Sequence, residues 1–132
     1  MQYLITKPWP WTFTAIVLGV ILWLTLGKPP APDEDVHLWE HTDKIVHAIM
    51  FGGLYYTLWF DYLRKHNIIE PRRFSWSSLL FGVFSIAVGG IVEIIQPSFN
   101  RTCDIMDFIA DSAGVTVAWI VTPFFLPRFC RR

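Results

Sequence analysis

The chain alternates between long apolar stretches and short polar segments, and this alternation predicts its helices. The apolar stretches cover residues 11–26, 45–63, 76–95 and 105–126. A helix needs roughly 20 apolar residues to cross the hydrocarbon core of a bilayer, and each stretch comes close to that length. Runs this long favour helices over strands, because backbone in lipid must satisfy its own hydrogen bonds. We therefore predict an all-α, polytopic membrane protein, a bundle of four transmembrane helices over about 9–27, 44–63, 75–96 and 104–126.

Composition supports a membrane protein and excludes one class of partner. The 132 residues allow a single domain, 1–132, and 53% of them are hydrophobic, with 7 Trp and 11 Phe. A soluble domain of this size has too little interior to hide so much apolar surface. Because 11 basic residues balance 11 acidic ones, no positive field would recruit nucleic acid.

The first apolar stretch has one alternative explanation, a secretory signal peptide, because Lys7 precedes it. The residues that follow it are Gly27, Lys28, Pro29 and Pro30, which lack the small-x-small pattern of a cleavage site. We expect an uncleaved anchor helix.

Basic residues predict the orientation of the bundle in the bacterial cytoplasmic (inner) membrane. Four spans put both termini and the second loop on one side, and eight of the eleven basic residues lie there: Lys7, Arg64, Lys65, Arg72, Arg73, Arg128, Arg131 and Arg132. The positive-inside rule assigns that side, with both termini, to the cytoplasm. An aromatic belt is expected at the same inner interface, from Trp9, Trp11, Trp59, Tyr62 and Trp76. Cys103 and Cys130 then face opposite sides, so no disulfide joins them.

Small residues recur four apart in three of the predicted helices. The pairs are Ala48 with Gly52, Ser85 with Gly89, and Ala110 with Gly114. Residues four apart share a helix face, and small side chains there let two helix backbones approach closely. We expect these faces to be helix–helix contacts.

Polar side chains from three predicted helices reach the same outer depth. Asp43 and His47 share a face at the start of the second helix, and Glu93 lies one turn before Pro97 at the end of the third. The fourth helix begins with three carboxylates on one face: Asp104, Asp107 and Asp111. Ionised groups at membrane depth are costly, so several at one level predict a shared polar pocket.

Simpler explanations exist for most of these residues. Asp43 could cap the second helix, and Asp104 and Asp107 could cap the fourth. His47 could be a hydrogen-bonded packing residue, and Glu93 could form a buried structural pair with Arg101. For Asp111, two turns inside its helix, no helix-end role is available.

The order and spacing of these residues resemble the VanZ-like family of bacterial integral membrane proteins. The resemblance rests on Asp43-Lys44-x-x-His47-x-x-x-Phe51, Glu93-x-x-Gln96, Arg101-x-x-Asp104-x-x-Asp107, and Gly114. It covers about two thirds of the chain, from Asp43 to the end of the fourth helix. One position departs from the family pattern, because this chain has Asp111 where the family usually has Asn. The resemblance implies a setting in the cell envelope, and the family's namesake is associated with low-level resistance to the glycopeptide teicoplanin.

The first functional hypothesis is an outward-facing pocket that binds or modifies a lipid-linked or phosphate-bearing head group. Lys44 and Arg101 would hold the anion. Glu93 and His47 are candidate catalytic acid and base, oriented by Asp43. The remaining ligand-binding candidates are Gln96, Asp104, Asp107 and Asp111. A divalent cation is a possible cofactor, and its candidate ligands are His47, Asp104, Asp107 and Asp111.

Two further hypotheses use the same residues. The bundle could shield an envelope lipid or a glycopeptide-related ligand without any chemistry. Alternatively, an oligomer could transport protons or a small solute, although the inner half of the sequence offers only Asp61 as a matching polar group. The sequence leaves open whether the protein is an enzyme and what its oligomeric state is.

Overall fold

The chain forms four α-helices joined end to end by short segments. The computed structural model describes residues 9–27, 39–66, 75–99 and 103–130, and this described part contains no strand. The helices are α1 (Thr12–Leu26), α2 (Trp39–His66), α3 (Trp76–Ile95) and α4 (Ile105–Cys130), and the 3₁₀ helix η3 (Gln96–Phe99) continues α3. The all-α fold class predicted from the sequence is therefore confirmed.

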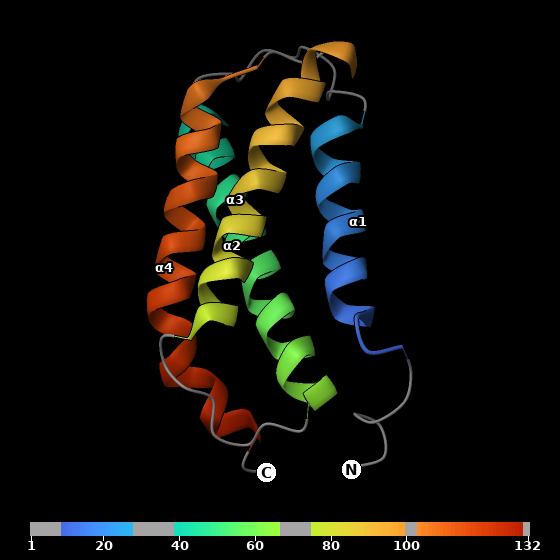
Figure 1. The fold of residues 1–132 in the computed structure, drawn as a ribbon. Coiled ribbons are helices and arrows are strands. Elements are labelled where there is room, and N and C mark those ends of the chain that lie inside the picture. The colour runs from blue at the N-terminus through green and yellow to red at the C-terminus, as the bar shows by residue number, and fades with distance from the viewer. Residues whose placement is uncertain (1–8, 28–38, 67–74, 100–102, 131–132) are drawn as a thin grey trace.

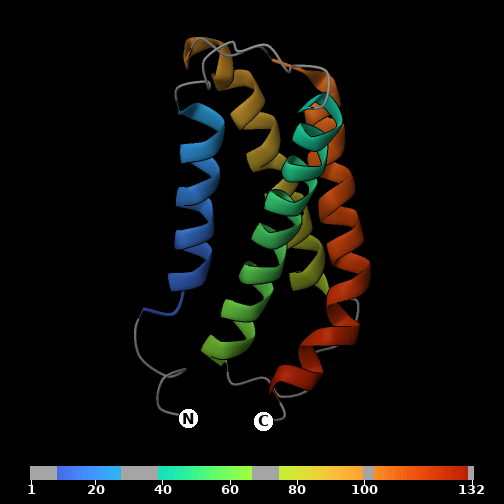
Figure 2. The same ribbon diagram turned by 180° about the vertical axis from the view of Figure 1, so that it is seen from behind.

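The four helices run alternately up and down (Figure 1). The start of α1 and the end of α4 lie at one end of the bundle, which we call the lower end, and the start of α2 lies at the upper end with the end of α3. Helix α2 packs most extensively against α4, whereas α1 contacts mainly α2. The view from behind shows α1 standing apart from α4 on the far side of α2 (Figure 2).

Two of the helices are long and apolar enough to cross a membrane. They are α3 together with η3 (Trp76–Phe99) and the α4 segment Ile105–Phe124. Helix α1 is also apolar but has only 15 residues.

The bundle buries many polar side chains beside its apolar core and exposes many large apolar ones. The buried polar or charged side chains are Thr14, Thr25, His47, Asp61, Ser78, Ser85, Glu93, Gln96, Asp107, Asp111 and Thr122. Large apolar side chains instead point outward on every helix, and examples are Ile16, Trp23, Ile49, Leu80, Ile94 and Ile105. Soluble monomers rarely expose contiguous apolar surface on this scale, so the outer face of the bundle is suited to lipid.

Helices α2 and α4 approach each other most closely at glycine. A Cβ atom on Gly114 would overlap the Ala48 backbone, and one on Gly52 would lie 3.0 Å from the Gly114 carbonyl oxygen. The small residues predicted to line helix contacts therefore do so in this pair. The contact fixes the depth of α2 against α4, and with it the depth of His47, the residue before Ala48.

Three expectations about individual elements need correction. Helix α2 begins at Trp39 rather than near residue 44, so Asp43 lies inside the helix and does not cap it. Helix α4 continues to Cys130, past Pro123 and Pro127, and its last turns bend (Figure 1). Trp59 is only 3% exposed and stacks on Tyr62, so it belongs to the bundle interior and not to an aromatic belt.

Candidate functional site

Three helices bring ionisable side chains together at the upper end of the bundle. The second and third turns of α2 supply Lys44 and His47, the last turn of α3 supplies Glu93, and the first turns of α4 supply Asp107 and Asp111. One ligand atom each from His47, Glu93 and Asp107 lie within 4.8 Å of one another. We call these three residues together with Asp111 the upper cluster.

His47 is held in place by Asp111. Its Nδ1 lies 2.9 Å from Asp111 Oδ1, in a contact between two buried side chains. Gly89 of α3 makes room for that carboxylate, because a Cβ on Gly89 would lie 3.0 Å from Asp111 Oδ2. The Ser85 and Gly89 face predicted as a helix contact thus packs against a carboxylate. Because Asp111 is bound to Nδ1, the imidazole directs Nε2 toward Asp107, whose Oδ2 lies 3.9 Å away.

Glu93 connects α3 to the start of α4. Its Oε2 accepts a hydrogen bond from the backbone N–H of Asp104 at 3.1 Å. Its Oε1 is buried and has no hydrogen-bond partner among the described residues. The Glu93 side chain is therefore anchored by one oxygen, with the second one buried at the cluster.

Asp104 and Lys44 form the rim of the cluster. Asp104 Oδ1 accepts the N–H of Met106 at 2.9 Å, which is helix capping as the simpler explanation expected. Lys44 Nζ lies 3.8 Å from both Asp104 Oδ2 and Asp107 Oδ1. Because Lys44 and Asp104 are partly exposed, they are accessible from the upper end, whereas the upper cluster behind them is buried.

Three more predicted site residues remain, and the structure describes the side chain of one of them, Gln96. Gln96 is 3% exposed in η3, and its Oε1 accepts no hydrogen bond from the described residues. The side chain of Asp43 and all of Arg101 lie outside the described residues. Of the metal ligands expected from sequence, His47 and Asp107 lie close to each other and to Glu93, whereas Asp104 caps α4 and Asp111 contacts His47.

The cluster combines the groups needed for acid–base chemistry or for cation binding. An imidazole oriented by a carboxylate can accept or donate a proton at its other nitrogen. Two carboxylates beside that nitrogen can instead share a metal ion with it. Burial strengthens either interaction, because a water-poor site has a low effective dielectric constant.

A second polar network joins α1 to α2 at the lower end. Asp61 is fully buried, and its Oδ2 accepts hydrogen bonds from the backbone N–H and the hydroxyl of Thr14 at 2.9 and 2.8 Å. Arg64 Nη2 lies 3.2 Å from Asp61 Oδ1 and donates to the Pro10 carbonyl at 2.9 Å. Sequence reasoning missed this network. The i, i+3 spacing of Asp61 and Arg64 was the available signal, but nothing local indicates Thr14.

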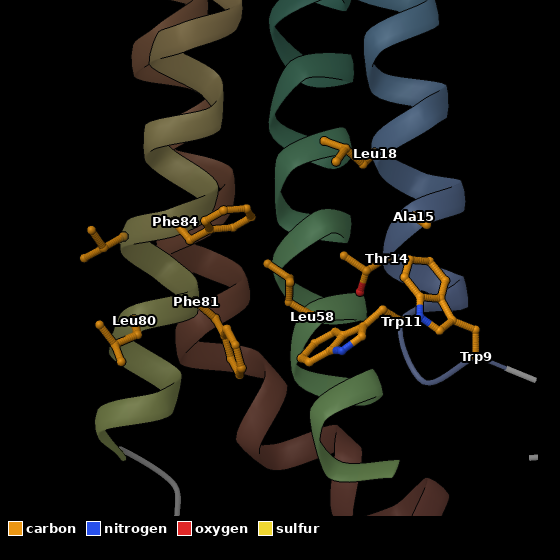
Figure 3. A pocket seen from close by; sticks show the side chains of 10 residues that line it. Trp9, Trp11, Thr14, Ala15, Leu18, Leu58, Leu80, Phe81 and Phe84 are labelled. Atoms are coloured by element: carbon orange, nitrogen blue, oxygen red, sulfur yellow. The ribbon is translucent and has the colours of Figure 1, made fainter. Parts of the chain in front are cut away.

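A cleft of about 700 Å³ lies in the lower half of the bundle, and Thr14 of the second polar network is part of its wall (Figure 3). Side chains of α1, α2 and α3 form its walls: Trp11, Thr14, Ala15, Leu18, Leu58, Leu80, Phe81, Val83 and Phe84, with Trp9 at its edge. None of these lining residues is ionisable, so the cleft offers no acid–base chemistry.

Comparison with known proteins identifies a family for the chain. A protein-family model described as VanZ/LLP1 matches residues 5–126, which is nearly the whole chain and covers α1, α2, α3 and α4 as far as Leu126. No curated protein and no solved structure matches the chain.

Proposed function

Because this chain belongs to the VanZ/LLP1 family and is a membrane protein, we propose that it binds or modifies a phosphate-bearing head group of a cell-envelope lipid. The head group would enter the pocket at the upper end of the bundle. In this proposal all four helices, in a single domain, cross the bacterial inner membrane, with both termini in the cytoplasm. The upper cluster then lies beneath the outer head groups.

The burial of the upper cluster is the observation that carries the proposal. His47, Glu93, Asp107 and Asp111 are each at most 7% exposed, and they come from three different helices. Keeping so many ionisable groups inside a small bundle is expensive, and such intramembrane groups usually face a functional pocket. Their position one to two turns below the exposed Lys44 and Asp104 is suited to a ligand that enters from the membrane surface.

The cationic groups decide which head group fits. Lys44 is the positively charged side chain that the structure describes at the rim, and Arg101 stands in the segment just before α4. Ammonium and guanidinium groups form strong charge-assisted hydrogen bonds to phosphate oxygens. A neutral lipid head group would leave both side chains without such a partner, so a phosphate is the better ligand.

Binding of short-chain lipids to the purified chain tests the proposal. Dioctanoyl phosphatidic acid carries a bare phosphate, and dioctanoylglycerol is the matched lipid without it. We expect the phosphatidic acid to bind more tightly, and Lys44→Gln to weaken it about 10-fold, because a charge-assisted hydrogen bond contributes roughly 1.5–3 kcal/mol. Lys65→Gln, the same change at the lower end of α2, is the control. Equal binding of the two lipids would refute the proposal, as would an equal loss of phosphatidic acid affinity in Lys44→Gln and Lys65→Gln.

Glu93→Gln separates an enzyme from a non-enzymatic binder. If Glu93 is a general acid, the variant still binds phosphatidic acid or an isoprenyl phosphate, but mass spectrometry finds no converted lipid where the native chain gives one. If the protein only shields its ligand, no conversion is seen in either chain, and the variant loses affinity in proportion to any change in teicoplanin susceptibility of cells that express it.

Transport is the less favoured alternative, for a reason visible in the bundle. Between the two polar networks the core consists largely of apolar side chains: Phe51, Leu54, Leu58, Val92 and Val115, with Tyr55 beside them. At the lower end Asp61 is already engaged by Thr14 and Arg64. A proton or solute would therefore meet an apolar barrier within the described part of a single chain.

A further inference from the structure

We infer that His47, Glu93 and Asp107 bind one divalent transition-metal ion of the zinc or manganese class. The inference rests on the proposed function in one respect: the ion would occupy the same pocket as the lipid head group. It deepens that function by naming the cation that would face the phosphate. Its starting point is the proximity of one nitrogen and two carboxylate oxygens within 4.8 Å.

The second observation is the way His47 is supported. Metal-binding histidines usually donate their other ring N–H to a carboxylate, which fixes the tautomer and the ring orientation. Asp111 Oδ1, 2.9 Å from His47 Nδ1, is such a carboxylate. The ring nitrogen on the opposite side, Nε2, faces Asp107 Oδ2 at 3.9 Å. That distance is too long for a hydrogen bond but suited to two ligands of one ion.

The third observation is Glu93 Oε1. This oxygen is buried on a side chain only 4% exposed, and it has no hydrogen-bond partner among the described residues. A buried carboxylate oxygen without a partner is expensive, and a bound cation removes that cost. Zinc ligands lie about 2.0–2.2 Å from the ion, so the three side chains need to close by only about 1 Å around it.

Charge also favours a cation at this place. Among the described residues, four carboxylates (Glu93, Asp104, Asp107 and Asp111) face Lys44 and the imidazole of His47. A phosphate entering such a pocket would be repelled unless further positive charge were present. A divalent ion supplies it, and three protein ligands leave an open position for an oxygen of the head group.

The set of ligand atoms decides which metal ion suits the site. A histidine nitrogen beside two carboxylates suits zinc or manganese, whereas magnesium prefers oxygen ligands alone. The test therefore uses Co²⁺, a coloured substitute, added to the purified metal-stripped chain and followed by visible absorption. We expect saturation at one Co²⁺ per chain, release by Zn²⁺, and no release by the same concentration of Mg²⁺.

Variants distinguish a built site from general attraction to acidic groups. His47→Gln and Asp107→Asn should abolish the Co²⁺ spectrum, and Asp111→Asn should weaken binding about 10- to 100-fold, as loss of an outer-shell partner does. Ser112→Ala, on α4 next to Asp111, is the control that leaves binding unchanged, because its hydroxyl bonds only to the Phe108 carbonyl. Circular dichroism of each variant verifies that the helices are retained. Because Asp111→Asn keeps an acceptor for His47, it remains informative if the other variants do not fold.

Absence of saturable Co²⁺ binding would overturn the inference, as would Mg²⁺ displacing Co²⁺ as readily as Zn²⁺ does. Phosphatidic acid binding measured with and without a chelator separates this outcome from the fate of the proposed function. If the lipid binds through Lys44 whether or not chelator is present and Co²⁺ does not bind, the metal site is wrong and the proposed function stands. If Co²⁺ binds and the lipid does not, the metal site stands and the proposed function is wrong.

Discussion

At the scale of single residues, Asp61 is a fully buried carboxylate outside the upper cluster. A fully buried carboxylate is tolerated because Thr14 donates two hydrogen bonds to it and Arg64 neutralises it. Removing one partner of a buried pair leaves the other charge uncompensated, which is more damaging than losing the pair's net interaction. The Arg64 guanidinium, which also lies over the Phe13 ring at 5.1 Å, would be left in that position.

We therefore predict that Asp61→Ala lowers the free energy of unfolding by about 3–5 kcal/mol. Asp61→Asn should lower it less, because the amide oxygen can still accept from Thr14. Thermal unfolding in a mild detergent measures both. The control is Thr116→Val. The Thr116 hydroxyl donates to the Ser112 carbonyl within α4, so its removal should change the free energy of unfolding by no more than about 0.5 kcal/mol. Native-like melting of both Asp61 variants would contradict the prediction.

Local spacing predicted some of the residue contacts and could not predict others. The i, i+3, i+7 pattern placed Asp107 and Asp111 on one face, and both are buried at the upper cluster. Which carboxylate holds His47 depends on the rotation of α2 against α4, and this is not a local property. The sequence offered Asp43 as a partner, four residues away, and the Asp43 side chain lies outside the described residues; the contact with Asp111, 64 residues away, was not predicted.

At the scale of helices, the α2–α4 contact depends on a glycine. In lipid, no hydrophobic force drives helices together, so close van der Waals contact at small residues decides which pairs form. A methyl group on Gly114 would overlap backbone atoms of Ala48, and backbone cannot move aside as a flexible side chain can.

Gly114→Ala should therefore destabilise the bundle by about 1–3 kcal/mol, as overpacking of a tight contact typically does. Gly53→Ala is the matched control on α2, because a Cβ there meets nothing within 4 Å. Alanine's higher helix propensity should leave that variant neutral or more stable by up to about 1 kcal/mol. Fluorescence-detected gel filtration after heating measures the fraction of each variant that stays folded. Equal folded fractions for Gly114→Ala and Gly53→Ala would mean that α2 and α4 have room to separate.

The existence of the helices was predictable, and their ends were less so. Long, predominantly apolar runs set the centres of all four helices. The start of α2 at Trp39 was not predicted, because residues 40–43 are polar and contain no helix breaker, so the helix begins before the apolar stretch does. Similarly, the fourth apolar stretch ends at residue 126, but α4 continues to Cys130.

At the scale of the whole molecule, short connections make consecutive helices antiparallel, which is why the up-and-down order followed from sequence. The packing partners did not follow, because large apolar side chains point outward on every helix and hydropathy alone does not distinguish the packing face from the outer face. Nothing in the sequence predicted that α1 contacts mainly α2, or that a 700 Å³ cleft separates it from α3.

The orientation of the bundle can be tested with the chain's own two cysteines. Cys103 is exposed just before α4, at the upper end, and Cys130 is the last residue of the same helix, at the lower end. The positive-inside rule predicts that the lower end faces the cytoplasm, since eight of the eleven basic residues lie toward that end, in the termini, the second loop, the last turn of α2 and the end of α4. A membrane-impermeant maleimide added to intact cells should therefore label Cys130→Ser, which retains Cys103. The Cys103→Ser chain should react only after the membrane is permeabilised. The opposite pattern would turn the upper cluster toward the cytoplasm, and a ligand confined to the outer leaflet could then no longer reach it.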